Sequence, residues 1–219
     1  MHKVVDNLLN IKNQLKEFTK ETTVNKPKII AVSKTFSMDK IIPLITYGHL
    51  DYGENKVQEA ISKWTDIKKK YPSIKLHMIG KLQTNKVKHA VSLFDYIHSL
   101  DNIKLAEKIA IEQKKSKRDL KIFIQVNVGN EFQKNGLATN NLKGFYKKCT
   151  QELNLNIVGL MCIPPHNQLT IKYFSQMQEL NKSINLKELS MGMSEDYIDA
   201  MSYGSTYLRL GSKIFGRRV

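Results

Sequence analysis

The sequence has few cysteines, no long apolar run and no recognisable secretion signal. Its 219 residues include two cysteines, Cys149 and Cys162, which lie outside any metal-binding or redox spacing. The longest nearly apolar stretch, residues 157–163, is far shorter than the ~18 residues that a membrane-spanning helix requires. The amino terminus leads into a polar helical pattern without the hydrophobic segment of a secretory signal. We therefore expect a reduced, cytoplasmic protein with no membrane segment.

Arginine is scarce, although the chain is strongly basic. The net charge is +15, from 35 Lys and Arg against 20 Asp and Glu, and only four of the 35 are arginine. Such a balance is typical of proteins with a nucleic-acid or membrane-surface partner. Readers of bases and phosphates, however, rely on the bidentate guanidinium group. Because the lysines are also spread along the chain, we expect a solvated Lys-rich surface and no nucleic-acid partner.

Short β-rich runs alternate with helical segments along the whole chain. Apolar residues from Val4 to Phe18 recur at helical spacing, so the first element is predicted to be an amphipathic helix. The predicted strands cover residues 29–32, 50–52, 75–79, 94–98, 121–128, 156–161, 187–190 and 206–210. The predicted helices between them cover residues 38–47, 55–70, 84–91, 102–116, 140–152, 168–183 and 195–203.

Eight strands that alternate with helices indicate a parallel sheet covered by helices. In a chain of this length they predict an α/β fold, a single (β/α)8 TIM-type barrel that forms one domain over residues 1–219. The leading helix is expected to cover the gap beside the eighth strand. An open, doubly wound sheet is the alternative, although such sheets usually have fewer strands.

Two loops near the carboxyl terminus resemble a phosphate site. The loop from Ser190 to Ser194 and the turn at Gly211 and Ser212 follow the seventh and eighth predicted strands, where barrels of this type hold phosphate. They offer glycine for close backbone approach, hydroxyl groups and N–H groups at a helix start. Each loop alone could be an ordinary helix cap or turn. Together, at these two places, they favour phosphate binding.

Two cations at predicted strand ends complete the pattern. Lys34 follows the first strand, where partial burial would favour the neutral, nucleophilic amine that condenses with an aldehyde; a surface lysine is the alternative. Arg209 lies between two leucines in the eighth strand, and a structural ion pair with Glu54 is its alternative. His77 is either a core histidine or a site residue. A lysine for an aldehyde, loops for a phosphate and a cation between them suggest pyridoxal 5′-phosphate (PLP).

The motifs, taken in order, resemble those of the pyridoxal phosphate homeostasis protein family. This family comprises single-barrel relatives of the alanine racemase N-terminal domain. The resemblance runs from about residue 28 to the carboxyl terminus. It rests on the motifs at residues 31–34, 53–55 with 58–59, 77–86, 159–161, 189–194 and 209–216.

The resemblance implies a role for each matching residue. Lys34 would hold PLP as an internal aldimine, Arg209 would face the pyridine nitrogen, and Asn55 would lie beside the cofactor. The residues from Ser190 to Ser194 and the turn after the eighth strand would hold the phosphate. The complete set of expected cofactor-binding residues is Lys34, Asn55, His77, Ser190, Met191, Gly192, Ser194, Arg209, Gly211 and Ser212.

The resemblance also implies a carrier that buffers or delivers PLP in vitamin B6 homeostasis, without robust catalysis. An arginine at the pyridine nitrogen disfavours its protonation and so weakens the ring as an electron sink. The end of the sequence at Val219 leaves no further domain that would supply a second catalytic base. The alternative is a PLP-dependent amino-acid enzyme, such as a weak racemase or a transaminase. We expect a monomer, no catalytic residue and no metal, with PLP-requiring apo-enzymes as candidate partners.

Overall fold

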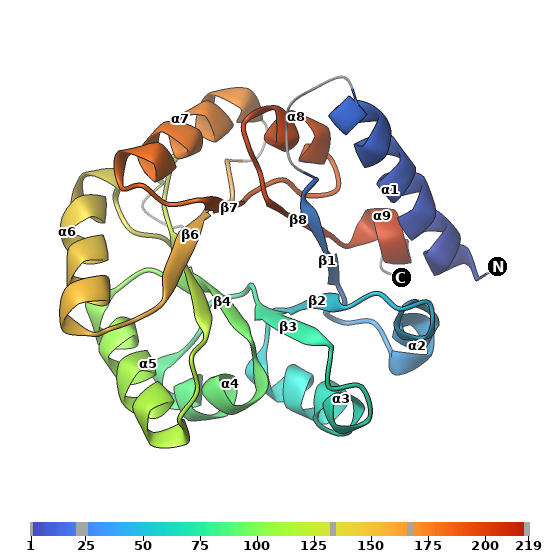
Figure 1. The fold of residues 1–219 in the computed structure, drawn as a ribbon, viewed down its shortest axis with the longest axis horizontal. Coiled ribbons are helices and arrows are strands. Elements are labelled where there is room, and N and C mark those ends of the chain that lie inside the picture. Colours follow the sequence, from blue (N-terminus) through green and yellow to red (C-terminus); the bar gives the residue numbers. More distant parts are fainter. Residues whose placement is uncertain (1, 21–25, 132–134, 166–168, 217–219) are drawn as a thin grey trace.

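The computed structural model describes residues 2–20, 26–131, 135–165 and 169–216, and its strands form a closed parallel barrel (Figure 1). The barrel closes because β1 pairs with both β2 and β8, which excludes the open, doubly wound alternative. The strands, in chain order, are β1 (Lys28–Val32), β2 (Asp51–Glu54), β3 (Lys75–Met78), β4 (Tyr96–Leu100), β5 (Lys121–Gln125), β6 (Ile157–Met161), β7 (Glu188–Ser190) and β8 (Tyr207–Leu210).

Helices surround the barrel, and α1 packs over the β1–β8 side as predicted from the sequence (Figure 1). Asn7 on α1 donates to the carbonyl oxygen of Ile214 on α9 (2.9 Å), which joins the two ends of the chain. No helix within the described residues has the length and apolarity needed to cross a bilayer. The helices are α1 (Lys3–Lys20), α2 (Met38–Thr46), α3 (Val57–Lys70), α4 (Val87–Leu93), α5 (Ile103–Ser116), α6 (Leu142–Lys147), α7 (Thr170–Ser183), α8 (Tyr197–Ser202) and α9 (Ser212–Phe215); short 3₁₀ turns lie at Thr84–Lys86 and Thr139–Asn141, and α6 continues as a π-helical turn, Lys148–Glu152.

Each strand differs from its predicted range by one residue or more, and the fourth and fifth strands are among those that differ most. The fourth strand begins at Tyr96, two residues late, because the N–H of Phe94 still donates to the carbonyl of Ala90 at the end of α4 (2.9 Å). The fifth strand ends at Gln125, and Val126 makes only an isolated bridge beyond it. In both places buried hydrophobic side chains lie outside the regular ladder, with Phe94 before the fourth strand and Val126 and Val128 after the fifth.

Two helices near the carboxyl terminus also differ from those predicted. The last long helix was expected to begin at residue 195, but α8 begins at Tyr197. The carboxylate of Asp196 instead accepts the N–H of Met193 (2.6 Å) and closes the preceding loop. The turn expected at Gly211 and Ser212 opens the short helix α9.

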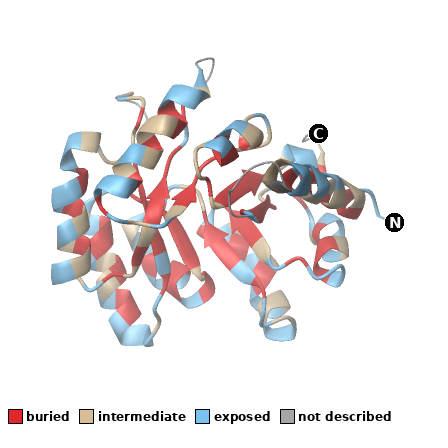
Figure 2. Ribbon diagram, turned by 45° about the horizontal axis from the view of Figure 1, so that its top comes forward, coloured by how far each residue is buried: buried red, intermediate tan, exposed pale blue. Residues whose placement is uncertain are grey.

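Two layers of buried side chains fill the molecule. The larger layer lies between the strands and the helices and consists mainly of Leu, Ile and Val (Figure 2). The smaller layer lies inside the barrel and contains Ile30, Tyr96, Phe123, Met161 and Tyr207. The interior layer also encloses polar groups, among them His77, His98 and Ser190.

Candidate functional site

The segment after β1 forms a tight turn that carries Lys34. The N–H of Phe36 donates to the carbonyl of Ser33 across the turn (3.2 Å), and Lys34 between them is half-buried. Thr35 has a φ of 67°, in the left-handed region that β-branched residues rarely adopt. Backbone strain of this kind persists only where surrounding contacts hold it. The turn that presents Lys34 therefore needs external support.

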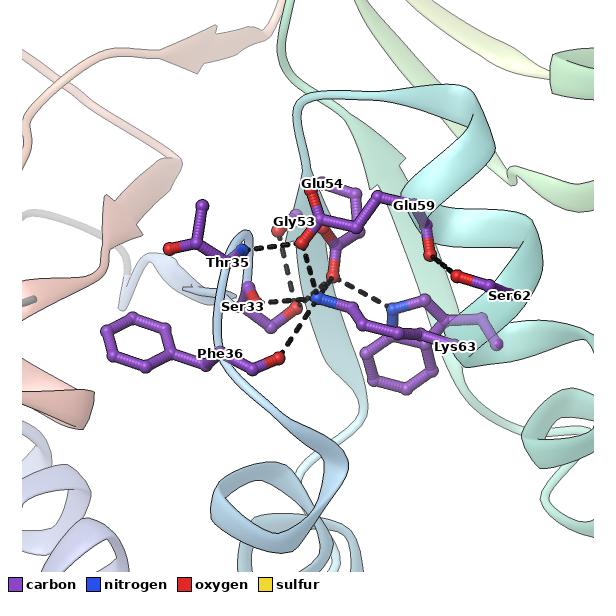
Figure 3. Close-up of polar contacts among 9 residues, drawn as sticks. Ser33, Thr35, Phe36, Gly53, Glu54, Glu59, Ser62 and Lys63 are labelled. Carbon is purple, nitrogen blue, oxygen red and sulfur yellow. Dashed lines mark hydrogen bonds and ion pairs between the residues drawn. The ribbon is translucent and has the colours of Figure 1, made fainter.

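Lys63 on α3 supplies part of that support (Figure 3). Its Nζ donates to the carbonyl oxygens of Ser33 (2.8 Å) and Phe36 (3.3 Å), which are the two ends of the turn. The same ammonium group pairs with Glu54 (2.7 Å) and Glu59 (2.9 Å). Glu54 is fully buried and the Lys63 side chain is 12% exposed. A mostly desolvated ion-pair network thus links α3 and β2 to the turn that carries Lys34.

The two carboxylates of this network also contact the turn directly (Figure 3). Glu59 accepts the N–H of Thr35 (2.5 Å), which stabilises the strained residue. Glu54 accepts hydrogen bonds from the hydroxyl of Ser33 (2.8 Å) and the indole N–H of Trp64 (3.0 Å). Partial burial alone would raise the pKa of Glu59, but the hydrogen bonds and nearby cations outweigh it and the pKa is lowered. Glu59 is therefore a carboxylate at neutral pH.

Asn55 follows β2 and is placed by the close approach of Gly80. A Cβ atom at position 80 would lie 2.4 Å from the backbone oxygen of Asn55, so only glycine fits there. The Oδ1 atom of Asn55 is buried and has no hydrogen-bond partner among the described residues. Because buried polar atoms are nearly always hydrogen-bonded, this oxygen is a candidate acceptor for a donor group on a ligand.

The loops after β7 and β8 lie side by side, as the sequence predicted. Gly192 has a φ of 88°, and a Cβ atom there would lie 2.7 Å from the Cβ of Ala200. Its carbonyl accepts the N–H of Arg209 (3.0 Å), and the Ser194 hydroxyl accepts the N–H of Lys213 (3.4 Å). Of the residues expected to hold phosphate, Ser190, Met191 and Gly192 are buried, Ser194 and Gly211 are half-buried and Ser212 is exposed.

Arg209 is a buried cation that donates to neutral oxygen atoms. One terminal nitrogen contacts the carbonyl oxygen (2.6 Å) and the hydroxyl (2.8 Å) of Ser190, and the other contacts the carbonyl of Cys162 (2.8 Å). No described carboxylate lies within ion-pair distance of it. The alternative of an ion pair with Glu54 is wrong, because Glu54 pairs with Lys63. Burial lowers the pKa of Arg209, and burial raises that of the neighbouring Cys162 thiol to about 12.

A line of buried polar groups continues from Arg209 through the interior of the barrel. The Ser190 hydroxyl lies 2.9 Å from Nδ1 of His98, and Nε2 of His98 lies 3.0 Å from Nδ1 of His77. Nε2 of His77 lies 3.0 Å from a carboxylate oxygen of Asp51, the first residue of β2. Ser190, His98 and His77 are fully buried. We call the four residues Asp51, His77, His98 and Ser190 the polar column.

The polar column changes the interpretation of two residues that the sequence placed at the cofactor. Both ring nitrogens of His77 contact protein groups, so its connection to Arg209 runs through His98 and Ser190. The hydroxyl of Ser190 points to His98 and Arg209. Sequence reasoning missed His98, although it stands two residues after Tyr96 in β4 and so shares the inward face of that strand.

Comparison with known proteins places the chain in a family. The family model for the alanine racemase N-terminal domain matches residues 7–219. A pyridoxal phosphate homeostasis protein of Aquifex aeolicus is 36% identical over 203 residues, which cover 89% of this chain and 88% of that protein.

Solved structures agree with this placement. PipY of Synechococcus elongatus, solved without PLP, has a TM-score of 0.87 and is 32% identical, over 97% of this chain and all of that chain. The same protein with PLP bound has a TM-score of 0.86 and 31% identity. With its closed barrel, its leading helix and the matched motifs, this chain belongs to the pyridoxal phosphate homeostasis protein family.

Proposed function

We propose that this protein binds PLP at the carboxyl end of its barrel and serves as an intracellular carrier of the cofactor. The observation that carries the proposal is the placement of a lysine and a buried arginine around one barrel mouth. Lys34 follows β1, and Arg209 on β8 pairs in register with Ile30 of β1. The family relative PipY, which shares this fold, has been solved with PLP bound.

The groups around the mouth fit the chemistry of PLP. The amine of Lys34 would attack the aldehyde carbon, with formation of a C=N bond and loss of water. The guanidinium of Arg209 would donate to the pyridine nitrogen, and Asn55 would contact the ring substituents through its unpartnered side-chain atom. The backbone from Met191 to Ser194, together with Gly211 and Ser212, would hold the phosphate with N–H and hydroxyl donors.

A carrier function is supported by the surroundings of Arg209. A cation at the pyridine nitrogen disfavours protonation of the ring, so bound PLP would be a weak electron sink for carbanions. No described carboxylate forms an ion pair with Arg209, and the charge of Asp196 acts on it only from beyond that distance. A weak sink disfavours the carbanion chemistry of racemases and transaminases, and we propose transfer of PLP to apo-enzymes instead.

The covalent link is tested by reduction with borohydride followed by peptide mass mapping. We expect one added pyridoxyl group, on Lys34, together with the loss of the visible absorption band. A label on Lys81 or Lys86, two lysines that follow Gly80 in the sequence, would contradict the assignment. Incubation of the loaded protein with a PLP-free transaminase should restore the activity of that enzyme. Rapid turnover of amino acids by this protein alone would instead favour the alternative function, that of a PLP-dependent amino-acid enzyme.

A further inference from the structure

The ionised end of the polar column determines the direction of all its hydrogen bonds. An ionised carboxylate can only accept, so Nε2 of His77 must carry a proton toward Asp51. Burial alone would raise the pKa of Asp51, but the contact with His77 outweighs it, so the pKa is lowered and the carboxylate is ionised at neutral pH. Burial also lowers the pKa of His77, so the ring is neutral and its Nδ1 is an acceptor.

The same reasoning extends to the other end of the column. Because Nδ1 of His77 accepts, Nε2 of His98 must donate to it. Burial lowers the pKa of His98 well below its ordinary value, so Nδ1 of His98 accepts the hydroxyl proton of Ser190. The Ser190 oxygen is then left to accept from Arg209, which has only donors. Every proton in the column therefore points from Arg209 toward Asp51.

The rings of the column are held in place by aromatic packing. His77 stacks on Tyr96 and His98 stacks on Phe123, with ring centroids 4.2 Å apart in each pair. The edge of Tyr207 faces His98. The column thus runs from the buried guanidinium to Asp51, whose side chain is 22% exposed at the start of β2. That position is the amino end of the barrel, opposite the mouth that carries Lys34.

The charges around the column favour this direction. Lys28 lies over Tyr207 and donates to its hydroxyl (3.2 Å), and Lys121 lies over Tyr96. Both lysines begin strands at the amino end of the barrel, and the charge of Lys28 acts on the carboxylate of Asp51. Arg209 is the cation at the other end. The neutral rings between the two ends therefore connect a buried cation to a partly exposed anion.

We propose that Asp51, His77 and His98 are positioning residues for Arg209, acting through the hydroxyl of Ser190. They orient the Ser190 hydroxyl so that its oxygen accepts a hydrogen bond from Arg209, and this bond holds the guanidinium in one orientation. Because Arg209 is directed at the pyridine nitrogen in the proposed function, this inference rests on that function. A substitution at the amino end of the barrel then alters how Arg209 contacts the pyridine ring of the cofactor.

The direction of the column is tested on the protein without PLP. Long-range ¹H–¹⁵N spectra of histidine rings distinguish the two neutral tautomers and the charged form. At pH 7 we expect His77 and His98 both to be neutral and protonated at Nε2. An Nδ1–H tautomer or a charged ring at either position would overturn the proposal. This measurement needs no variant and no cofactor.

The effect on Arg209 is tested with two variants of His98 and a matched control. His98→Phe keeps the ring stack and removes the acceptor, whereas the carboxamide oxygen of His98→Asn can occupy the Nδ1 position. We expect His98→Phe to shift the visible band of the PLP-loaded protein, change its pH titration and weaken PLP affinity about ten-fold. His98→Asn should recover most of the affinity and the band. His89→Phe, at an exposed histidine on α4 that has no contact with the column, should match the wild type.

The outcomes separate this inference from the proposed function. The proposal would be overturned if both His98 variants changed the spectrum equally, or if neither did. In that case the column would only pack the barrel interior and would not orient Arg209. If the wild type took no borohydride label at Lys34, the proposed function would fail, while the tautomers would still report on the column.

Discussion

The two sides of the barrel mouth hold their cationic side chains with different chemistry. The turn that carries Lys34 is braced by a charged network, in which Lys63 bridges Glu54 and Glu59. Arg209 is held by two carbonyl oxygens and by the neutral hydroxyl of Ser190 at one end of the polar column. Burial of charge is costly unless each charge is paired, so the first arrangement depends on every member of the network. The second tolerates the loss of one neutral member better.

The difference also suits what each cation must do. The amine of Lys34 has to lose its charge to react with an aldehyde, and its own turn is held by an ammonium on another residue. Arg209 has to stay charged, and the groups that position it do not neutralise it.

Lys34→Ala should abolish covalent attachment of PLP while the fold is retained. The reason is that the other amine at this turn, that of Lys63, is already engaged by two carboxylates and two carbonyl oxygens. The measurement is the borohydride label, with circular dichroism as the check on folding. Lys81→Ala, at an exposed lysine after β3, is the matched control and should keep the full label. Retention of the label in Lys34→Ala would contradict the assignment.

Lys63→Met should destabilise the protein by about 3–5 kcal/mol, because it leaves the buried carboxylate of Glu54 without its cation. Chemical denaturation measures the change. Adding Glu54→Gln should recover part of it, since the two substitutions act on one contact. Lys69→Met removes an exposed pair with Asp66 and should have no measurable effect. Equal effects of the two lysine variants would show that the network does not support the turn.

Ser212→Ala and Ser190→Ala should differ in their effect on ligand binding. Ser212 lies in the expected phosphate turn, so its loss should weaken PLP binding by about 1.5–3 kcal/mol and leave pyridoxal binding unchanged. Ser190 contacts Arg209 and His98, so its loss should weaken both ligands. Titration of each variant with the two ligands checks this. A selective loss of PLP affinity in Ser190→Ala would assign its hydroxyl to the phosphate.

The stability of the protein should fall as the pH decreases below about 6.5. Burial lowers the pKa of His77 and His98, and that of His49 to about 4. The unfolded chain therefore binds protons near pH 6.5 that the folded protein does not bind. Stability from these rings is present above pH 6.5 and is lost as the pH falls toward their folded pKa values.

His98→Phe should make this pH dependence shallower. The unfolded chain of the variant binds one proton fewer. The slope of the unfolding free energy against pH therefore falls by about 1.4 kcal/mol per pH unit between pH 6.5 and the folded pKa of the ring. Denaturation curves at pH 7, 6 and 5 give the slope for the variant and for the wild type. Identical slopes would mean that His98 is protonated in the folded protein.

Much of the architecture could be predicted because it depends on local pattern. Alternation of short apolar runs with amphipathic segments predicted the eight-stranded barrel, and helical periodicity predicted α1. The boundaries were less predictable. Asp196, for example, closes the loop before α8 by a side-chain contact that no periodicity reveals.

The sequence by itself determined which residues stand at the ends of the strands. Strand order in a parallel barrel brings the ends of β1, β7 and β8 together, so Lys34, the loop after β7 and the turn after β8 were identified from spacing and the family motifs. Only the tertiary structure decided the partners of these residues. Glu54 pairs with Lys63 instead of Arg209, and Ser190 turns toward His98, which is 92 residues away in the chain. The physical reason is that side chains alternate between the two faces of a strand, so the sequence of one strand indicates which side chains point into the barrel. Hydrogen bonds across the interior depend instead on the closure of all eight strands.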